Sequence, residues 1–378
     1  MYIKMKNNLS FIKFINNSLI NLPTPLNIKL TWNMGSLLGI CLIIQLISGL
    51  FLAFRYSPDI NLAFKSINLI MNESWNGFLI RNIHANGASL FFLFIYIHIG
   101  RGIYYKSFLF KNTWIIGTLI LLLLMMSAFM GYVLPWGQMS FWGSTVITNL
   151  MSSIPYFGNS LVQWIWGGFS INNPTLTRFF CIHFIMPFII LMLTMIHIFF
   201  LHFTGSNNPL GINSNMMKIK FNPFFTIKDL MGLMVMIIML IFMIIWLPYF
   251  FMDSDNFILA NPMVTPVHIQ PEWYFLFAYS ILRAIPSKLG GVIALMMSIM
   301  ILFFIPFMNL SKMKSNQFYY LSKLNFWFFF INNILLTWIG MQPVEMPFIF
   351  IGQMLSIFYF MFYFLSPIID LLTDKIIN

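Results

Sequence analysis

The amino-acid sequence predicts an all-α membrane protein with eight transmembrane helices. Its 378 residues are 60% hydrophobic and only 8% charged, and one soluble core cannot bury that much apolar side chain. The apolar residues also fall into runs of about 20, the length of a helix that crosses the hydrocarbon layer. We expect spans at residues 33–54, 76–105, 112–134, 174–204, 227–248, 289–309, 321–341 and 347–366.

The charges predict how these helices are oriented. An even number of spans puts both termini on one side. That side has fourteen Lys and Arg residues, Lys4 and Lys6 among them, and only three Asp residues. The opposite side has six basic and six acidic residues, so the whole net charge of +11 belongs to the side of the termini. The positive-inside rule makes this the inner side. The basic composition therefore follows from topology and does not indicate a nucleic acid partner.

Three segments follow from this topology. Residues 1–32 form an inner N-terminal segment, in which MYIKMKNNLSFIKF has no long apolar run and predicts no signal peptide. Residues 33–205 form a four-helix bundle with an outer loop at 135–173. Residues 206–378 form a C-terminal four-helix region with an outer loop at 249–288. Both outer loops mix Pro, Trp and short amphipathic turns, so we expect short surface helices there.

Four histidines in the bundle share one spacing. His84 and His98 are fourteen residues apart, and so are His183 and His197. Fourteen residues make nearly four helical turns and rise about 21 Å, so each pair occupies one helix face at two depths. One span separates the two helices, which therefore run parallel, with His84 opposite His183 near the outer face and His98 opposite His197 near the inner face.

The histidine pairs predict two stacked haems. An ionisable side chain within the membrane costs roughly 2.5 kcal/mol or more unless it has a partner. Two haem irons, each ligated by two of the imidazoles, would provide partners for all four histidines. A core histidine bonded to a hydroxyl is the ordinary alternative for a single residue. Cys41 and Cys181 are the only cysteines and form no C-x-x-C-H motif, so the haems would be non-covalent, b-type groups.

Glycines repeat the same fourteen-residue step on the other two helices of the bundle. A residue without a side chain allows a porphyrin edge to approach the backbone. Any one glycine is weak support because glycine is common in membrane helices, but four with one period favour two planar ligands. They are Gly35, Gly49, Gly117 and Gly131.

Two arginines are candidates for pairing with haem propionates. Arg81 lies one turn before His84 and Arg101 one turn after His98, each toward the nearer water surface. For Arg101, the alternative that it only flanks the end of a membrane helix stays open. Arg178 lies five residues before His183 and is off the histidine face.

A haem iron with two axial histidines has no open position, so it carries electrons. A relay across a membrane needs a lipid-soluble donor and acceptor with proton-handling groups at each end. His202 and Asp229 are the inner candidates, near Ser206 and Lys228, although Asp229 is also suited to a helix start. Glu272 in the PEWY segment is the outer candidate, and capping of the following helix is its alternative.

The chain resembles mitochondrial-type cytochrome b in stretches that cover nearly everything after Pro25. The stretches are WNMGSLLG, RNIHANGASLFFLFIYIHIGRGIYY, GYVLPWGQMSFWG, TLTRFFCIHFIMPF, HFTGSNNPLG and QPEWYFLFAYSILRAIP. The resemblance implies the central subunit of ubiquinol–cytochrome c oxidoreductase, with a Q cycle that contributes to the proton gradient. It also implies the mitochondrial inner membrane with both termini in the matrix, a Rieske iron–sulfur protein, cytochrome c1 and other subunits as partners, membrane lipids, and a dimeric complex.

The resemblance further implies roles for particular residues. The outer haem would be the low-potential one and the inner haem the high-potential one. Tyr132, Tyr279, Glu272, His202 and Asp229 would act in catalysis. The outer ubiquinol pocket would contain Met125, Phe129, Tyr132, Gly143, Pro271, Glu272, Phe275 and Tyr279. The inner quinone pocket would contain Asn33, Ser36, His202, Ser206, Phe221, Lys228 and Asp229. Departures from the family pattern at Ser144, Ser287 and Phe203 affect pocket shape and no expected ligand.

Two other classes of protein compete with this interpretation. A transmembrane ferric reductase or superoxide-generating oxidase also stacks two bis-histidine haems, but it needs a nicotinamide and flavin module, and no Gly-rich strand-to-helix turn occurs in this sequence. A transporter whose histidines relay protons would show no haem spectrum. One reduced-minus-oxidised spectrum separates the transporter from the other two.

Overall fold

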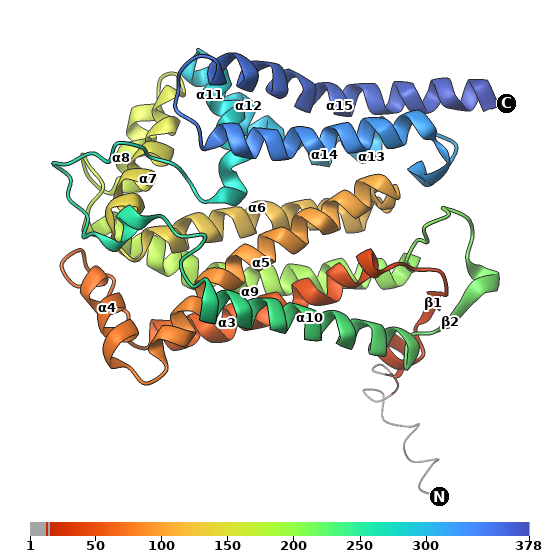
Figure 1. Cartoon of the computed structure of the whole chain (residues 1–378), viewed down its shortest axis with the longest axis horizontal. Coiled ribbons are helices and arrows are strands. Elements are labelled where there is room, and N and C mark those ends of the chain that lie inside the picture. The colour runs from red at the N-terminus through yellow and green to blue at the C-terminus, as the bar shows by residue number, and fades with distance from the viewer. Residues whose placement is uncertain (1–12, 14–15, 378) are drawn as a thin grey trace, which may run out of the picture.

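The computed structural model describes residue 13 and residues 16–377. Lys4 and Lys6, which we assigned to the inner face, lie outside the described residues, as does most of the stretch in which we expect no signal peptide. The described chain is mainly helical, in agreement with the predicted all-α class (Figure 1).

Among the residues that the structure describes, six helices are long and apolar enough to cross a membrane. They are α3 (Met34–Ala53), which the 3-10 turn η2 (Leu30–Asn33) precedes, α5 (Gly77–Tyr104), α6 (Lys111–Val133), α9 (Asn173–Thr204), α10 (Phe224–Trp246) and α15 (Phe348–Ile377). Each matches a predicted span, although α15 continues eleven residues beyond the predicted end at 366.

The other two predicted spans are not continuous, strongly apolar helices. The region 289–309 is divided into α12 (Lys288–Met300), η8 (Ile301–Phe303) and α13 (Ile305–Met308), with a proline early in α13. The region 321–341 is one helix, α14 (Tyr320–Gly340), which is long enough to cross but less apolar because it carries several asparagines. Two of them donate to α15, Asn325 to the Ser366 hydroxyl and Asn332 to the Leu355 carbonyl.

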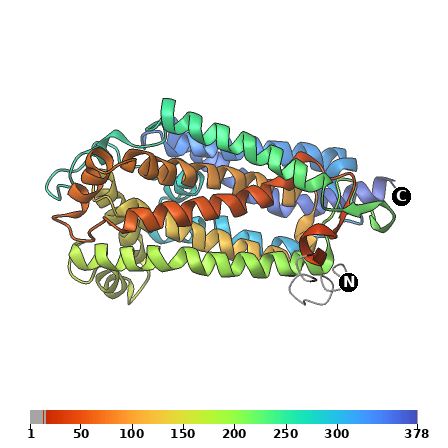
Figure 2. The ribbon, with the colours of Figure 1, turned by 90° about the horizontal axis from the view of Figure 1, so that it is seen from below.

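The bundle consists of two tightly packed helix pairs. α3 packs on α5, and α6 packs on α9. The four helices run side by side along the long axis of the molecule, with α10 against α3 and α5 (Figures 1 and 2). Asn172 starts α9 with a capping box completed by Thr175, and Pro174 occupies the first turn, where its missing N–H costs nothing. This arrangement leaves α5 and α9 facing each other across the bundle.

The outer end is covered by short helices, as predicted for the two outer loops. They are α7 (Gln138–Asn149), η4 (Leu150–Ser153), α8 (Gly158–Trp166), η6 (Ser254–Phe257), η7 (Trp273–Phe275) and α11 (Leu276–Ala284). The two loops are joined by a bridge between Gly137 and Leu259 and by the Asn256 side chain, which accepts from the backbone and hydroxyl of Ser140. The sequence analysis did not predict α4 (Ala63–Glu73), an amphipathic helix between the first two spans.

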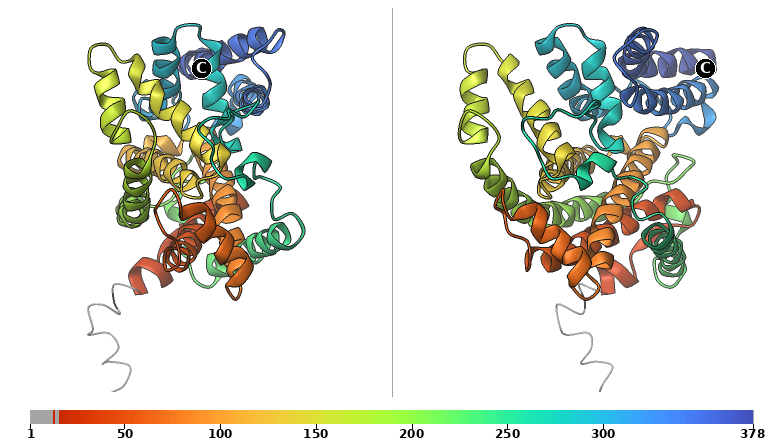
Figure 3. Two further views of the ribbon diagram at one scale, coloured as in Figure 1. Left: turned by 90° about the vertical axis from the view of Figure 1, so that its left-hand side faces the viewer. Right: turned by 60° about the vertical axis from the view of Figure 1, so that its left-hand side comes forward.

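The inner end holds both the described start of the chain and the end of α15 (Figure 2). A two-stranded sheet there pairs β1 (Pro23–Pro25) with β2 (Lys218–Lys220). The remaining short elements are η1 (Asn16–Ile20), η3 (Ser107–Leu109), η5 (Asn215–Met217) and η9 (Asn316–Phe318). Helices α11, α12, α14 and α15 gather on the side of the bundle away from α3 and α10 (Figure 3). With both ends at one end of the molecule, the fold agrees with the predicted topology.

Candidate functional site: stacked histidine pairs and an outer cavity

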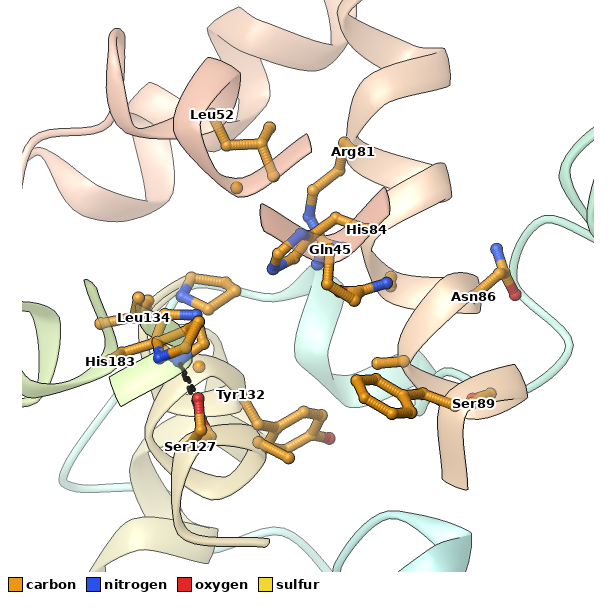
Figure 4. Close-up of a pocket in the computed structure, with 18 of the residues that line it drawn as sticks. Gln45, Leu52, Arg81, His84, Asn86, Ser89, Ser127, Tyr132, Leu134 and His183 are labelled. Carbon is orange, nitrogen blue, oxygen red and sulfur yellow. Dashed lines mark hydrogen bonds between the residues drawn. The ribbon is translucent and has the colours of Figure 1, made fainter. Parts of the chain in front are cut away.

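The outer histidine pair joins α5 to α9. The ring centroids of His84 and His183 are 6.3 Å apart, and both rings line one cavity (Figure 4). The Ser48 hydroxyl lies 2.9 Å from Nδ1 of His84, and the Ser127 carbonyl lies 2.8 Å from Nδ1 of His183. Engaging Nδ1 fixes the ring and leaves Nε2 free to ligate a metal ion.

The inner pair repeats the ring separation, and Nδ1 of its first histidine is engaged by a side chain. The ring centroids of His98 and His197 are 6.4 Å apart. Arg101 donates from Nη2 to Nδ1 of His98 at 3.1 Å, and its guanidinium lies 5.4 Å from the ring centroid of Trp32. The two pairs confirm that α5 and α9 run parallel, since antiparallel helices would have crossed them.

Both separations fit an iron between two imidazoles. Metal–imidazole bonds are about 2 Å long and each ring centroid lies about 1 Å from its nitrogen, so two rings on one metal ion stand about 6 Å apart. Within the described part of the chain, no group of three or more His, Cys, Asp or Glu side chains is arranged to hold a metal ion. A haem iron needs only two protein ligands, because its porphyrin supplies the other four.

Each of the four glycines lies against the histidine at its own depth. A Cβ on Gly49 would be 3.1 Å from Cε1 of His84, and one on Gly117 would be 3.1 Å from Cε1 of His197. The corresponding distances are 2.5 Å from Gly131 to His183 and 3.6 Å from Gly35 to His98. A Cβ at Gly131 would therefore force the His183 ring to move, and one at Gly49 or Gly117 would be a tight contact, whereas Gly35 has room for a methyl group.

The outer cavity has a volume of about 260 Å³ and is mostly apolar. Arg81 and Gln45 add polar groups to its wall beside His84 (Figure 4). In the part of the chain that is described, Gln45 Nε2 is buried without a hydrogen-bond partner. A buried donor without a partner is costly, so a polar ligand group in this cavity fits the site.

A second cavity of about 30 Å³ adjoins the first. Tyr132 and Glu272 line both cavities. The second cavity contains all of the proposed outer-pocket residues except Met125, which is buried in the core of the bundle. Four of the lining residues were not predicted from the sequence, Val146, Ile147, Ile269 and Gln270.

Glu272 is held by the segment that follows it. Tyr96 on α5 donates to the Tyr274 carbonyl at 2.5 Å, and Trp273 donates from Nε1 to the Ser89 hydroxyl at 3.2 Å. The Glu272 side chain makes no capping hydrogen bond to η7, so the capping alternative does not describe this structure. Burial raises the pKa of Glu272 to about 8, although the Arg81 guanidinium acts to lower it.

The inner candidates fall into two groups. Asn33 donates from Nδ2 to the Lys228 carbonyl at 2.8 Å, and the Ser36 hydroxyl lies near the Asp229 carboxylate. These four residues therefore meet where α3 and α10 begin, with Phe221 just before α10. Lys228 itself points to the Ile28 carbonyl, at 2.6 Å.

His202 and Ser206 form the second inner group, at the end of α9, where the His202 side chain is half-buried. Trp32 connects this end to the start of α3 by donating from Nε1 to the Asn207 carbonyl at 3.1 Å. Arg178 does not approach either histidine pair in the contacts of the described residues. It donates instead to the Trp164 and Ile165 carbonyls at the end of α8.

Comparison with known proteins shows the family of this chain. Residues 19–205 match the family model described as cytochrome b/b6/petB, and residues 259–360 match the model described as cytochrome b(C-terminal)/b6/petD. A solved structure titled "Hyperthermophilic respiratory Complex III" is similar over 99% of both chains, with 32% sequence identity and a TM-score of 0.92. The chain belongs to the cytochrome b family. It is a bc1-type electron-transfer subunit, and the family implies haem cofactors and a quinone-binding role.

In this cytochrome b, three residues at the outer pair were not predicted from the sequence. Ser48, Ser127 and Gln45 hold or surround His84 and His183. A sequence signal exists for the two serines, since Ser48 adjoins Gly49 and Ser127 lies one helical turn before Gly131. The role of Gln45 depends on contacts between helices that no spacing rule gives.

We predict that Gly143→Ala in this cytochrome b leaves the haem spectrum unchanged and weakens inhibitors that occupy the second cavity. A Cβ at Gly143 meets no atom within 4 Å, so the fold accommodates it, but it enters a cavity of only 30 Å³. One carbon of misfit costs about 1–3 kcal/mol, so we expect about tenfold weaker binding or more. Gly39→Ala is the control, because Gly39 is equally open and lines neither cavity. Equal inhibitor titrations of native protein and Gly143→Ala would contradict the pocket assignment.

Proposed function

We propose that this chain is the central catalytic subunit of a ubiquinol–cytochrome c oxidoreductase in the mitochondrial inner membrane. The family membership and the likeness to a Complex III structure along the whole chain support this proposal. In our proposal α12 with α13, and α14, complete eight spans, and both termini lie in the matrix, in agreement with the basic inner face. The partners are a Rieske iron–sulfur protein, cytochrome c1 and other subunits of a dimeric complex, together with membrane lipids.

Two non-covalent b-type haems are held by the two histidine pairs. His84 and His183 ligate the outer, low-potential haem, and His98 and His197 ligate the inner, high-potential haem. Arg81 and Arg101 pair with haem propionates, while Gly35, Gly49, Gly117 and Gly131 keep the space beside the rings clear. When bound, the haems supply one-electron transfer between the two quinone sites.

Ubiquinol is oxidised in the small outer cavity. The observation that carries this proposal is that Tyr132 and Glu272 line both this cavity and the cavity of the outer histidine pair. A quinol bound there lies beside the outer haem site, so its second electron has a short path into the membrane. Glu272 accepts a quinol proton, and Tyr132 and Tyr279 position the ring. The iron–sulfur protein takes the first electron.

Quinone is reduced at the inner end. Asp229 and His202 deliver the two protons that quinone reduction consumes. Asn33, Ser36 and Lys228 fix the start of α10 against α3 and so hold Asp229 in place. Phe221 and Ser206 complete the pocket. Protons are thus released outside and taken up inside, which is the outcome of a Q cycle.

The Glu272→Gln variant tests the quinol site. Glutamine cannot accept a proton, so quinol-dependent reduction of cytochrome c by the assembled complex should fall by roughly 10²-fold. The pKa of Glu272 is raised to about 8, so its ionised, proton-accepting form increases as the pH rises through that value. The native rate should therefore rise between about pH 7 and about pH 9, and the variant should lose this dependence.

Glu73→Gln is the matched control for this measurement. Glu73 is an exposed acidic residue at the end of α4, on the same outer end, and it lines neither cavity. It should keep the native rate and the native pH profile. A Glu272→Gln complex with the native rate and the native pH dependence would contradict the assignment of Glu272 as the proton acceptor.

A further inference from the structure

Lys106 occupies an unusual position at the inner end of α5. It follows Tyr105 in the turn between α5 and η3, with φ +51°, a left-handed conformation that a residue with a side chain adopts at a cost. Its side chain is nevertheless buried, with 3% of its surface exposed. Nζ donates to Oδ2 of Asp370 at 2.7 Å and to the Ser311 hydroxyl at 2.7 Å.

Asp370 lies near the end of α15, far from Lys106 in the sequence and equally buried, with 5% exposed. Its other oxygen accepts from the Ser322 hydroxyl. One turn later, Asp374 accepts from the Tyr319 hydroxyl and the Lys312 backbone. We call Lys106, Ser311, Tyr319, Ser322, Asp370 and Asp374 the inner latch.

The inner latch contains the one ion pair found among the described residues. Both charges are out of water, so each is stable only while the other is present. Burial lowers the pKa of Lys106, and the Asp370 carboxylate opposes that effect. The latch therefore fixes the turn after α5 to the end of α15, which lies beside it at the inner end (Figure 1).

The same turn contacts Arg101 on its other side. Arg101 donates from Nη1 to the Ser107 hydroxyl at 3.5 Å. The Tyr105 ring lies 4.8 Å from the ring of Trp32, which carries the Arg101 guanidinium on its face at 5.4 Å. Residues 105–107 thus hold Arg101 in the place where it meets Nδ1 of His98 at 3.1 Å.

We propose that Lys106 and Asp370 are positioning residues for the inner haem site. They act through the turn at residues 105–107, which holds Arg101 beside His98. The end of α15 thereby sets the environment of the inner haem, although it touches neither histidine pair in the described contacts. The inference rests on the proposed function, because it needs a haem on His98 and His197.

Asp370→Asn tests this proposal in the assembled complex. The variant leaves the Lys106 ammonium buried without its counter-charge, so the turn should move and carry Arg101 with it. A reduced-minus-oxidised spectrum titrated against potential should show a shifted midpoint for the inner haem and an unshifted one for the outer haem. Lys106→Gly should shift the inner midpoint as well, because glycine accepts the left-handed turn but cannot reach Asp370.

Thr373→Ala is the control on the same helix. Thr373 bonds only within α15 in the described contacts, to the Ile369 carbonyl, so both midpoints should stay native. The proposal is overturned if Asp370→Asn leaves both midpoints unshifted or shifts the two haems together. If the Asp370→Asn complex does not assemble, Asp370→Glu replaces it, because glutamate keeps the charge and displaces the carboxylate. It too should shift the midpoint of the inner haem and leave that of the outer haem unshifted. Failure of the proposed function is distinguishable from failure of this inference, because the native protein itself would then not show two haem midpoints.

Discussion

Replacing His183 with leucine is expected to remove the outer haem and to leave the inner haem in place. His183 and His84 face each other at a centroid separation of 6.3 Å, and the loss of either ring leaves the iron with one protein ligand. The haem content of the purified complex should fall to about half, because a bis-histidine site needs both imidazoles. The remaining spectrum should belong to the inner haem alone.

His98→Leu is the reciprocal variant and should remove the inner haem while the outer one remains. Its pair is separated from the outer pair by fourteen residues of helix, so the two sites should respond independently. His268→Gln is the control, because His268 lies in the outer loop and lines neither cavity. Two unaltered haem spectra in both ligand variants would show that these histidines do not hold iron.

Gly131→Ala should have nearly as large an effect on the outer haem as losing the ligand. Its Cβ would lie 2.5 Å from Cε1 and 3.0 Å from Nδ1 of His183, closer than carbon atoms approach one another. The imidazole must therefore move, and its hydrogen bond to the Ser127 carbonyl at 2.8 Å is disturbed with it. Optical spectra of the purified complex should show a lost or strongly shifted outer haem.

Gly35→Ala provides the matched comparison. Gly35 belongs to the same set of four glycines but lies at the depth of the inner histidine pair. Its Cβ would stand 3.6 Å from Cε1 of His98, an ordinary contact, so both haems should remain. The contrast between the two variants depends on the positions of the imidazoles and not on helix propensity, which is the same for both changes. Equal effects of Gly131→Ala and Gly35→Ala would contradict the geometry of the outer site.

The histidine and glycine positions were predictable from the sequence because an α-helix is periodic. A fourteen-residue step fixes which side chains share a face, whatever packs against it, so the pairing of His84 with His183 and of His98 with His197 followed without coordinates. The pairing of Gly49 with His84 or Gly131 with His183 needed the arrangement of the helices. That arrangement depends on packing between segments far apart in the chain.

Other features were not predictable because they depend on contacts between distant segments. In the sequence, Lys106 and Asp370 are two unrelated charges of the inner face. Only the folded chain brings Nζ of Lys106 to 2.7 Å from Oδ2 of Asp370. The asparagines of α14 lower its apolarity, and that two of them donate to α15 is visible only in the folded chain. The amphipathic α4 was missed because the segment between two spans was treated as a connection.

A reduced-minus-oxidised spectrum of the native complex, titrated against potential, tests the central claim most directly. Two imidazole pairs at 6.3 and 6.4 Å in different surroundings predict two b-type haems per chain with two separate midpoints. One haem per chain, or none, would contradict the account.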